Sequence, residues 1–394
     1  MILLDEAFSR LDAALEGRRL RRERVRLDEA RGRFLDADVA SLLDLPPFGR
    51  SAVDGYALLE GDYDRGRYRI LETVAAGHPG RAKLEPGTTV KVMTGAPVPA
   101  GTGKVVMLED AAEHDGFVQI HKVPKGLNFS RRAEDVRAGQ VVLTKGQRLG
   151  PLEIANLVAC GITEVDVVVP PSLYLISTGD EIVDSPKELQ LGKIMNSNGP
   201  LLARLAEEHQ LPVLGCASVR DDEAALELEL AGAIEKADIV VVSGGVSVGD
   251  YDFVPRILER LGMTVHFNRL AFKPGKPTTF ATGPNAVLFG LPGNPVAVYV
   301  MFHLMVLRGV ARLSGAPIAP LRFMVPLASD FRRRATARME YVPARISAEG
   351  RLERIEYHGS AHLIALMQAD GFFEVPVGVD HIPAGEPVPF RLIR

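Results

Sequence analysis

Short, continuous apolar runs alternate with helical stripes in the middle of the chain. The apolar runs cover residues 173–176, 213–219, 239–242 and 287–289. The stretches with helical spacing cover residues 201–208, 223–236, 255–261 and 296–310. Continuous apolar runs are typical of parallel strands buried on both faces, and strands that alternate with helices form βαβ units. The pattern therefore predicts a doubly wound α/β domain over residues 172–316.

An amphipathic helix is predicted near the first residue of the sequence. Leu4, Phe8, Leu11 and Leu15 form one apolar stripe with helical spacing. A second helix is predicted over residues 152–160. We expect both helices to belong to one helical and connecting domain.

The other apolar runs are short and are separated by Gly and Pro, which favours β-structure. Runs at 89–93 and 105–108 lie in a region that we expect to be inserted into the helical domain, and runs at 340–342 and 372–375 follow a linker-like segment. The sequence thus predicts an α/β multidomain fold. Its predicted domains are a helical domain (1–47 plus 129–171), an inserted β-rich domain (48–128), the α/β domain (172–316) and a small C-terminal β domain (317–394).

Composition narrows the class of protein. The chain has 394 residues, of which 46% are hydrophobic and 24% charged, as in ordinary globular proteins. Its net charge of −4 predicts no general attraction to nucleic acid or to anionic membranes. Cys160 and Cys216 are its two cysteines, so no disulfide framework or zinc site is indicated. We find no signal-like segment and no apolar stretch long enough to span a bilayer, and we expect a cytoplasmic protein.

The segment 243–252 follows an apolar run and has the sequence SGGVSVGDYD. Glycines let backbone amides approach a phosphate, hydroxyls donate hydrogen bonds, and carboxylates are hard oxygen ligands for Mg²⁺. The segment therefore points to a phosphorylated ligand with a divalent cation. The alternative is a tight turn whose aspartates cap a helix that begins near Phe253.

Three further turns lie at comparable positions in the predicted sheet. Residues 177–181 combine hydroxyls with two carboxylates, 220–222 contain two aspartates, and 290–295 have the sequence GLPGNP. In the last turn we expect Asn294 as the N-cap and Pro295 as the first helical residue, which leaves amides directed at an anion. Helix capping is the alternative for the first two turns, and a structural elbow for the third.

Lysines and arginines add possible anion ligands. Lys273 and Lys276 flank a Pro-Gly turn and would supply charge for a phosphate or another oxyanion, or the turn is an exposed hairpin connection. The cluster 130–135 places Arg131 and Arg132 beside carboxylates, as an anion clamp or as a surface ion pair. Segments 51–57 and 93–99 are polar turns by their spacing alone.

Taken together and in order, these motifs resemble the MoeA-type molybdopterin molybdenumtransferase family, which includes the carboxy-terminal domain of gephyrin. The resemblance covers residues 51–360. It implies an elongated homodimer of four domains that inserts molybdate into adenylylated molybdopterin with Mg²⁺-dependent release of AMP. It also implies an active site shared by the α/β domain of one subunit and the inserted domain of the other.

The resemblance assigns roles to individual residues. The implied catalytic residues are Asp54, Thr94, Glu181, Asp221, Asp252, Lys273 and Lys276, with Asp252 as the Mg²⁺ ligand and with Asp54 and Thr94 from the partner subunit. The implied substrate-binding residues are Arg131, Arg132, Asp135, Thr178, Gly179, Asp180, Ser243, Gly244, Gly245, Ser247, Gly249, Asp250, Pro292, Gly293, Asn294 and Pro295. The implied molybdate ligands are Lys273, Lys276, Arg338 and Ser360. Ser130 departs from the family, whose members carry arginine there.

Two other functions fit parts of this pattern. One is the preceding adenylyltransferase reaction, which a related α/β domain performs, although the residues around Arg338 and Ser360 favour insertion. The other is a gephyrin-like scaffold for membrane receptors, which would need an appended oligomerising domain. Expected partners are molybdate, adenylylated molybdopterin, a second copy of the chain, the adenylyltransferase and the enzymes that receive the cofactor.

Overall fold

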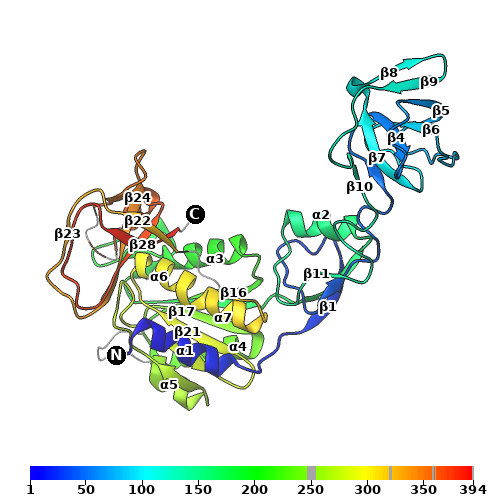
Figure 1. Ribbon diagram of the computed structural model, residues 1–394. Helices are drawn as coiled ribbons and strands as arrows, with labels where there is room; N and C mark the ends of the chain where they lie inside the picture. Colours follow the sequence, from blue (N-terminus) through cyan, green and yellow to red (C-terminus); the bar gives the residue numbers. More distant parts are fainter. Residues whose placement is uncertain (246–253, 319–321, 357–358, 360, 393–394) are drawn as a thin grey trace. The chain divides into compact units, whose positions relative to one another are not determined.

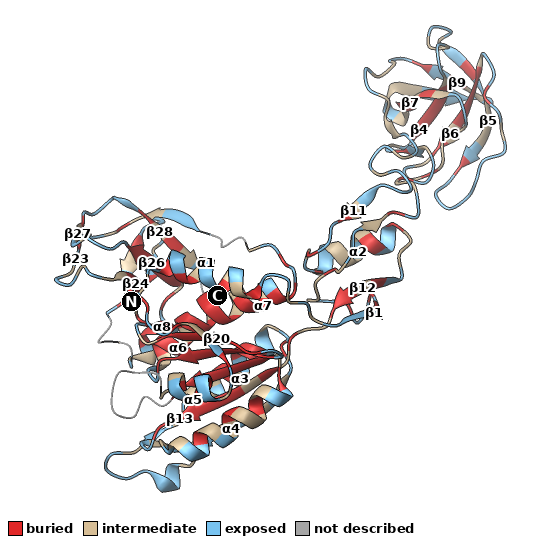
Figure 2. Cartoon of the chain, turned by 90° about the horizontal axis from the view of Figure 1, so that it is seen from below, coloured by how far each residue is buried: buried red, intermediate tan, exposed pale blue. Residues whose placement is uncertain are grey.

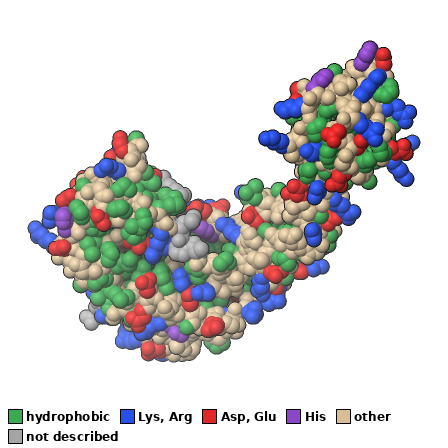
Figure 3. Space-filling model, in the orientation of Figure 1, with side chains coloured by type: hydrophobic (Ala, Val, Ile, Leu, Met, Phe, Trp, Pro, Cys, Tyr) green, Lys and Arg blue, Asp and Glu red, His purple; other side chains and the backbone are tan. Residues whose placement is uncertain are grey.

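The chain divides into two compact units, and we describe each separately. The computed structural model describes residues 1–245, 254–318, 322–356, 359 and 361–392. Unit 1 comprises residues 1–23, 32–36 and 168–394, and unit 2 comprises residues 24–31 and 37–167. On the visible face of both units, acidic and basic side chains are interspersed (Figure 3).

A six-stranded sheet forms the centre of unit 1. Its order is β16-β13-β17-β21-β20-β18, where the first four strands pair in parallel and the pairings β21-β20 and β20-β18 are antiparallel. The strands are β13 (Leu173–Thr178), β16 (Val213–Val219), β17 (Ile239–Ser243), β18 (Thr264–Phe267), β20 (Thr279–Thr282) and β21 (Val287–Leu291). In the parallel register Ser243 lies beside Ser177 and Leu291, so the carboxyl ends of three strands are level.

Helices cover both faces of this sheet (Figures 1 and 2). They are α1 (Leu4–Leu15), α3 (Asn198–Glu208), α4 (Glu223–Lys236), α5 (Val254–Arg260), α6 (Pro295–Met301), the π-helical turn η3 (Phe302–Val306) and α7 (Leu307–Leu313). Ile239 and Val241 of β17 belong to the core shared with α1, α3, α6 and α7, whereas Val240 and Val242 belong to the core shared with α4 and α5. Alternate residues of one strand thus face different helix layers, which confirms the predicted doubly wound sheet.

Helix α1 packs on α7 within unit 1. The predicted stripe is buried at Leu4, Leu11 and Leu15, and Asp12 accepts hydrogen bonds from Arg308 Nε and Nη2 at 2.9 and 2.6 Å. The predicted grouping of residues 1–47 with 129–171 differs from this arrangement, because an amphipathic stripe specifies a buried face but not its partner. The other predicted domain limits stay a prediction.

One helical span is longer than the sequence suggested. Contrary to the expectation that no apolar stretch could span a bilayer, Pro295–Leu313 has the required length and composition. It is the one such helix among the described residues, and 67% of it is buried in the protein. Much of its surface contributes to the core with the β-sheet.

A second sheet of unit 1 forms the C-terminal region. Its order is β19-β24-β26-β28-β22, and β25 pairs with β24. The elements are β19 (Phe272–Lys273), β22 (Phe323–Pro326), β23 (Phe331–Arg332), β24 (Met339–Ile346), β25 (Leu352–Arg354), α8 (Leu363–Met367), β26 (Gly371–Val375), β27 (His381–Ile382) and β28 (Pro387–Leu392). Phe331, Phe373 and Phe390 lie in its core. β19 joins β24 in parallel, so a segment of the α/β region enters this sheet.

Unit 2 contains a six-stranded β-sheet, as predicted for the inserted region. Its order is β7-β4-β6-β5-β9-β8, and its strands are β4 (Gly55–Leu59), β5 (Arg67–Val74), β6 (Thr88–Val92), β7 (Thr102–Met107), β8 (Ala111–His114) and β9 (Phe117–Ile120). Ala57 and Tyr56 belong to different apolar clusters, so both faces of the sheet are covered. The other elements of this part of the chain are β1 (Arg22–Arg26), β2 (Val39–Ala40), β3 (Arg50–Ser51), β10 (Phe129–Ser130), β11 (Val141–Leu143), α2 (Pro151–Ala159) and β12 (Glu164–Val168).

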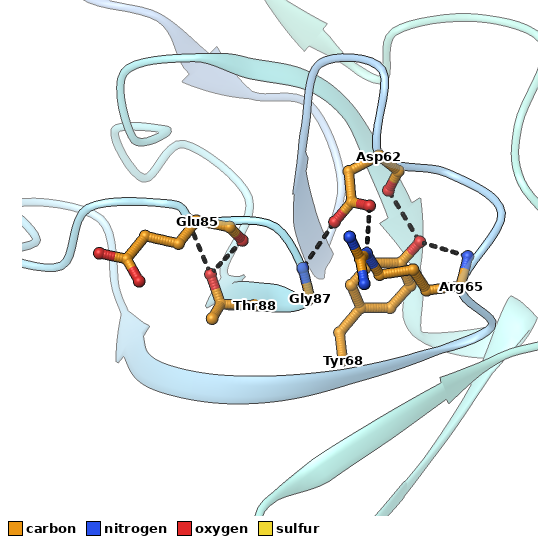
Figure 4. A network of polar contacts seen from close by, with 6 residues as sticks. All are labelled: Asp62, Arg65, Tyr68, Glu85, Gly87 and Thr88. Atoms are coloured by element: carbon orange, nitrogen blue, oxygen red, sulfur yellow. Dashed lines mark hydrogen bonds and ion pairs between the residues drawn. The ribbon is translucent and has the colours of Figure 1, made fainter.

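A polar network joins the loops that precede β5 and β6 (Figure 4). The buried Tyr68 donates its hydroxyl hydrogen to the carbonyl of Asp62 at 2.7 Å. The Asp62 carboxylate accepts hydrogen bonds from the Gly87 amide and from Arg65. Each of these loop groups therefore has a partner, and the network is structural.

Candidate functional site

A cavity of about 830 Å³ lies at the carboxyl ends of β13, β17 and β21. Loops that follow parallel strands meet at one edge of a sheet, which is where such folds bind ligands. The predicted site residues that line the cavity are Thr178, Gly179, Glu181, Asp221, Ser243, Gly244, Gly245, Lys273, Lys276, Pro292, Gly293, Asn294, Pro295 and Arg338. The fold thus brings together residues that are up to 160 positions apart in the sequence (338 minus 178).

The turn after β17 needs glycine for a steric reason. Gly244 has φ +92°, and a Cβ there would lie 2.4 Å from the Thr178 carbonyl oxygen. Its amide donates to the Leu291 carbonyl at 3.1 Å. The main chain of this turn therefore packs directly between the ends of β13 and β21, where no side chain fits.

Two buried polar atoms in the cavity wall have no hydrogen-bond partner among the described residues. They are Thr178 Oγ1 and Asn198 Oδ1. The Asn198 amide nitrogen donates to the Gly293 carbonyl at 2.7 Å, which fixes the orientation of this side chain. Buried polar atoms without partners are costly, so these two are suited to bind a polar ligand.

The sequence predictions missed several residues of the wall. The segment between β14 (Ile182–Val183) and α3 contributes four of them, the first residue of α3 is a fifth, and the C-terminal region contributes two more. They are Ile194, Met195, Asn196, Ser197, Asn198, Gly359 and Ala361. A possible signal was the polar run Asn196-Ser197-Asn198 ahead of the helical pattern of α3.

The two aspartates after β16 have different surroundings. Asp222 is the N-cap of α4, where its carboxylate accepts from the Ala225 amide at 2.7 Å. Asp221 lines the cavity, and burial together with the charges of Glu181 and Asp180 raises the pKa of its carboxyl group. Asp180 does not line the cavity, but its carboxylate accepts from the Asp221 amide at 3.3 Å. Helix capping, the alternative given for this turn, thus holds for Asp222, whereas Asp221 faces the cavity.

These carboxylates have the right chemistry for a hard cation. Glu181 and Asp221 offer oxygen ligands to the cavity. The pKa of Asp221 is raised first by burial and then by the charges of Glu181 and Asp180, and a bound cation would offset the cost of this buried charge. No group of three or more His, Cys, Asp or Glu side chains suited to a metal ion occurs within the described residues. The predicted ligand Asp252 lies outside them.

Cationic side chains line another part of the wall. Lys273 Nζ pairs with Glu340 Oε1 at 2.7 Å, and the Lys273 side chain is 45% exposed. Lys276 is exposed and Arg338 is partly buried, and neither side chain has an ion-pair partner in the part of the chain that the structure describes. Two cations are therefore available to an anionic ligand.

The turn 290–295 has the predicted helix-start geometry. Asn294 is the N-cap in an extended conformation, and Pro295 is the first residue of α6. The Asn294 carbonyl accepts the first helical hydrogen bond from Val298, while its side chain makes no capping bond.

The predicted site residues between positions 48 and 171 lie in unit 2. Asp54 accepts hydrogen bonds from the Thr94 amide at 2.6 Å and hydroxyl at 2.8 Å, and these bonds hold the pKa of its carboxyl group below the usual value. Arg132 pairs with Asp44 at 2.6 Å, which agrees with the ion-pair alternative for this residue. The Asp135 and Arg131 amides donate to Leu45 and Glu134 respectively.

Five predicted site residues lie outside the described residues. They are Ser247, Gly249, Asp250, Asp252 and Ser360. The helix expected near Phe253 is described from Val254 onward, as α5.

Three family models match consecutive regions of the chain. The MoeA N-terminal region (domains I and II) matches residues 2–161, a probable molybdopterin binding domain matches 174–312, and the MoeA C-terminal region (domain IV) matches 325–393. Together the matches extend over most of the sequence.

Curated relatives and solved structures agree with these models. A molybdopterin molybdenumtransferase of Haemophilus influenzae is 33% identical over an alignment 397 residues long, which covers 98% of this chain and 98% of the relative. One of Staphylococcus epidermidis is 32% identical over an alignment 378 residues long, which covers 92% of this chain and 88% of the relative. A structure of the molybdopterin biosynthesis MoeA protein from Pyrococcus horikoshii OT3 is 29% identical and superposes with a TM-score of 0.85 over 100% of both chains.

Proposed function

Since the chain belongs to the MoeA family of molybdopterin molybdenumtransferases, we propose that it inserts molybdate into adenylylated molybdopterin with Mg²⁺-dependent release of AMP. It is an enzyme of molybdenum cofactor biosynthesis. The observation that carries the finer proposal is the single cavity in which Lys273, Lys276 and Arg338 occur together with Glu181 and Asp221. Anionic ligands and a cation need this combination of charges.

In this proposal the glycine-rich turns hold the nucleotide and the pterin. Gly244 and Gly293 contribute main chain to the cavity wall, and because the Gly244 amide already donates to Leu291, we assign the Gly293 amide to a phosphate oxygen. Thr178 Oγ1 and Asn198 Oδ1 are the unpartnered polar atoms beside them. The other predicted substrate-binding residues are Gly179, Asp180, Ser243, Gly245, Ser247, Gly249, Asp250, Pro292, Asn294, Pro295, Arg131, Arg132 and Asp135.

Carboxylates would hold the magnesium ion. Glu181 and Asp221 line the cavity, and we assign Asp252 to the same ion. Mg²⁺ supplies charge neutralisation for the phosphoanhydride when bound.

Cationic residues would hold the oxyanions. Lys276 and Arg338 are available to bind molybdate, together with Lys273 and Ser360. An ammonium and a guanidinium both donate hydrogen bonds to oxyanions, and such charge-assisted hydrogen bonds are stronger than those between neutral groups. An oxygen of water or molybdate forms the new bond to phosphorus as the phosphoanhydride bond breaks and AMP leaves, and no side chain has to form a covalent intermediate.

The proposal includes a homodimer in the cytoplasm with a shared site. Asp54 and Thr94 would enter the site of the partner subunit as a hydrogen-bonded pair, and the low pKa of Asp54 keeps its carboxylate charged. The adenylyltransferase that supplies the substrate and the enzymes that receive the cofactor are the expected protein partners.

The decisive assay is AMP release from adenylylated molybdopterin with and without molybdate, repeated with tungstate. We expect release to depend on the oxyanion and on Mg²⁺. We also expect Asp252→Ala to abolish AMP release while the circular dichroism spectrum and melting temperature stay close to wild type. Unchanged turnover by this variant would exclude Asp252 as the metal ligand. Synthesis of adenylylated molybdopterin from molybdopterin and ATP would instead indicate an adenylyltransferase.

A further inference from the structure

Glu340 lies where the C-terminal sheet meets the cavity. It is the second residue of β24 and is paired with Lys273 of β19 in parallel register, although the two residues are 67 positions apart (340 minus 273). Its side chain is only 12% exposed. It does not itself line the cavity, but both Lys273 and Arg338, two residues before it, do.

Each oxygen of the Glu340 carboxylate has its own cationic partner. Lys273 Nζ lies 2.7 Å from Oε1, and Arg333 Nη1 donates to Oε2 at 3.3 Å. The pairs differ in exposure, because the Lys273 side chain is 45% exposed and the Arg333 side chain only 7%. A carboxylate that is hydrogen-bonded to two cations has little freedom to move.

Arg333 is anchored by the main chain. Its guanidinium donates to the carbonyls of Val379 at 2.7 Å and Arg338 at 2.9 Å, in addition to Glu340. One buried side chain therefore orients Glu340 and also holds the backbone of the cavity residue Arg338. This is a connected chain of contacts from the C-terminal sheet to two cations of the cavity.

We propose that Glu340 is a positioning residue, which holds the Lys273 ammonium at the cavity wall where the oxyanion binds. The inference rests on the proposed function, in which Lys273 contacts molybdate. A lysine has four rotatable side-chain bonds, and a half-exposed ammonium loses little by moving into water. The contact with Glu340 removes that freedom before the ligand arrives, so less entropy is lost on binding.

The test is a double-mutant cycle between Glu340→Gln and Lys273→Ala, read from the molybdate concentration that gives half of the maximal rise in melting temperature. The molybdate concentration that half-saturates AMP release is compared between wild type and Glu340→Gln, which keep Lys273, and it should change in parallel. We expect Glu340→Gln to raise both concentrations by about tenfold and to change kcat by less than about twofold. The reason is that the variant weakens molybdate binding equally in the ground state and in the transition state. In the Lys273→Ala background the same substitution should have no further effect, because the group that Glu340 positions is absent. The rise in melting temperature caused by molybdate provides a readout that does not depend on turnover.

Glu374→Gln is the matched control. Glu374 is a buried carboxylate in the neighbouring strand β26, bound to the Tyr341 hydroxyl at 2.7 Å and to Arg322 at 3.1 Å, and it does not line the cavity. We expect this variant to lose stability but to keep the wild-type half-saturation. If Glu340→Gln does not fold, Glu340→Asp keeps the charge for Arg333 and withdraws the oxygen from Lys273 by one methylene, with the same expected loss.

The outcomes separate the two proposals. An unchanged half-saturation in the Glu340 variants, or an equal effect in the Lys273→Ala background, would overturn the positioning role. Absence of molybdate-dependent AMP release from the wild-type protein would overturn the proposed function instead. In that case the melting-temperature shift of the wild type and of Glu340→Gln with molybdate would still decide whether Glu340 affects oxyanion binding.

Discussion

At the scale of single residues, adjacent side chains of the same type serve different purposes. Asp222 stabilises the start of α4, and Asp221 points its charge into a cavity with two other carboxylates nearby. A cap stabilises the fold, whereas crowded carboxylates oppose it unless a cation is present. Charge that destabilises a protein is typical of binding sites.

Asp221→Asn should therefore stabilise the metal-free protein at neutral pH and lower its activity. Burial and the neighbouring carboxylates raise the pKa of Asp221 in the folded state, so the charged form costs stability above that pKa. As the pH falls through the raised pKa toward the ordinary aspartate value, wild-type Asp221 takes up a proton and the advantage of the variant disappears. Melting temperatures of both proteins, measured with chelator across this pH range, give the comparison.

Asp222→Asn is the control for neutralising a nearby aspartate. Asparagine caps a helix about as well as aspartate, and only the favourable charge at the helix N-terminus is lost. We expect a small decrease in melting temperature at neutral pH, opposite in sign to the effect at Asp221. A decrease of similar size for Asp221→Asn would contradict the assignment of Asp221 to a crowded acidic site.

At the scale of elements, the end of β17 depends on a strand–turn contact. Gly244 lies against the Thr178 carbonyl with positive φ, and its amide bonds to the end of β21. The turn thus connects the carboxyl ends of three strands and forms part of the cavity wall. Its shape comes from main-chain packing rather than from side chains.

Gly244→Ala should lower the free energy of unfolding by about 1–3 kcal/mol and impair substrate binding, because the methyl group forces the turn away from Thr178. The control is Gly232→Ala in α4, where an added Cβ meets no atom within 4 Å. That variant should gain up to about 1 kcal/mol, because alanine favours helix. Urea unfolding of the two variants measures both changes, and equal stability of Gly244→Ala and wild type would show that the turn adapts.

At the scale of the whole molecule, the predicted site residues occur in both compact units. Lys273 and the cavity belong to unit 1, and Asp54 with Thr94 belongs to unit 2. The family resemblance implies that these groups meet across a homodimer. If two subunits share each active site, a dimer that combines two different inactive variants can contain one intact site, and this can be tested.

Mixed dimers of Asp54→Ala and Lys273→Ala chains should recover activity. Each variant alone is expected to be inactive, but a mixed dimer with a shared site contains one site with both native residues. Random mixing makes about half of the dimers mixed, so about one quarter of the wild-type AMP release should return. The measurement needs the two variants refolded or expressed together, with each one alone as control. No recovery in verified mixed dimers would place Asp54 and Lys273 in the site of the same chain.

The sequence by itself determined the α/β alternation, the β-rich insertion and the chemistry of the loops. Apolar runs and helical stripes depend on local periodicity, so the strand ending at Ser243 and the turn at Asn294 were predictable. Only the tertiary structure decided which surfaces pair: α1 on α7, and β19 beside β24. These contacts join residues that are distant in the chain, and no local pattern encodes them. The pairing of Lys273 with Glu340 and the position of Asn198 in the cavity wall follow from such contacts.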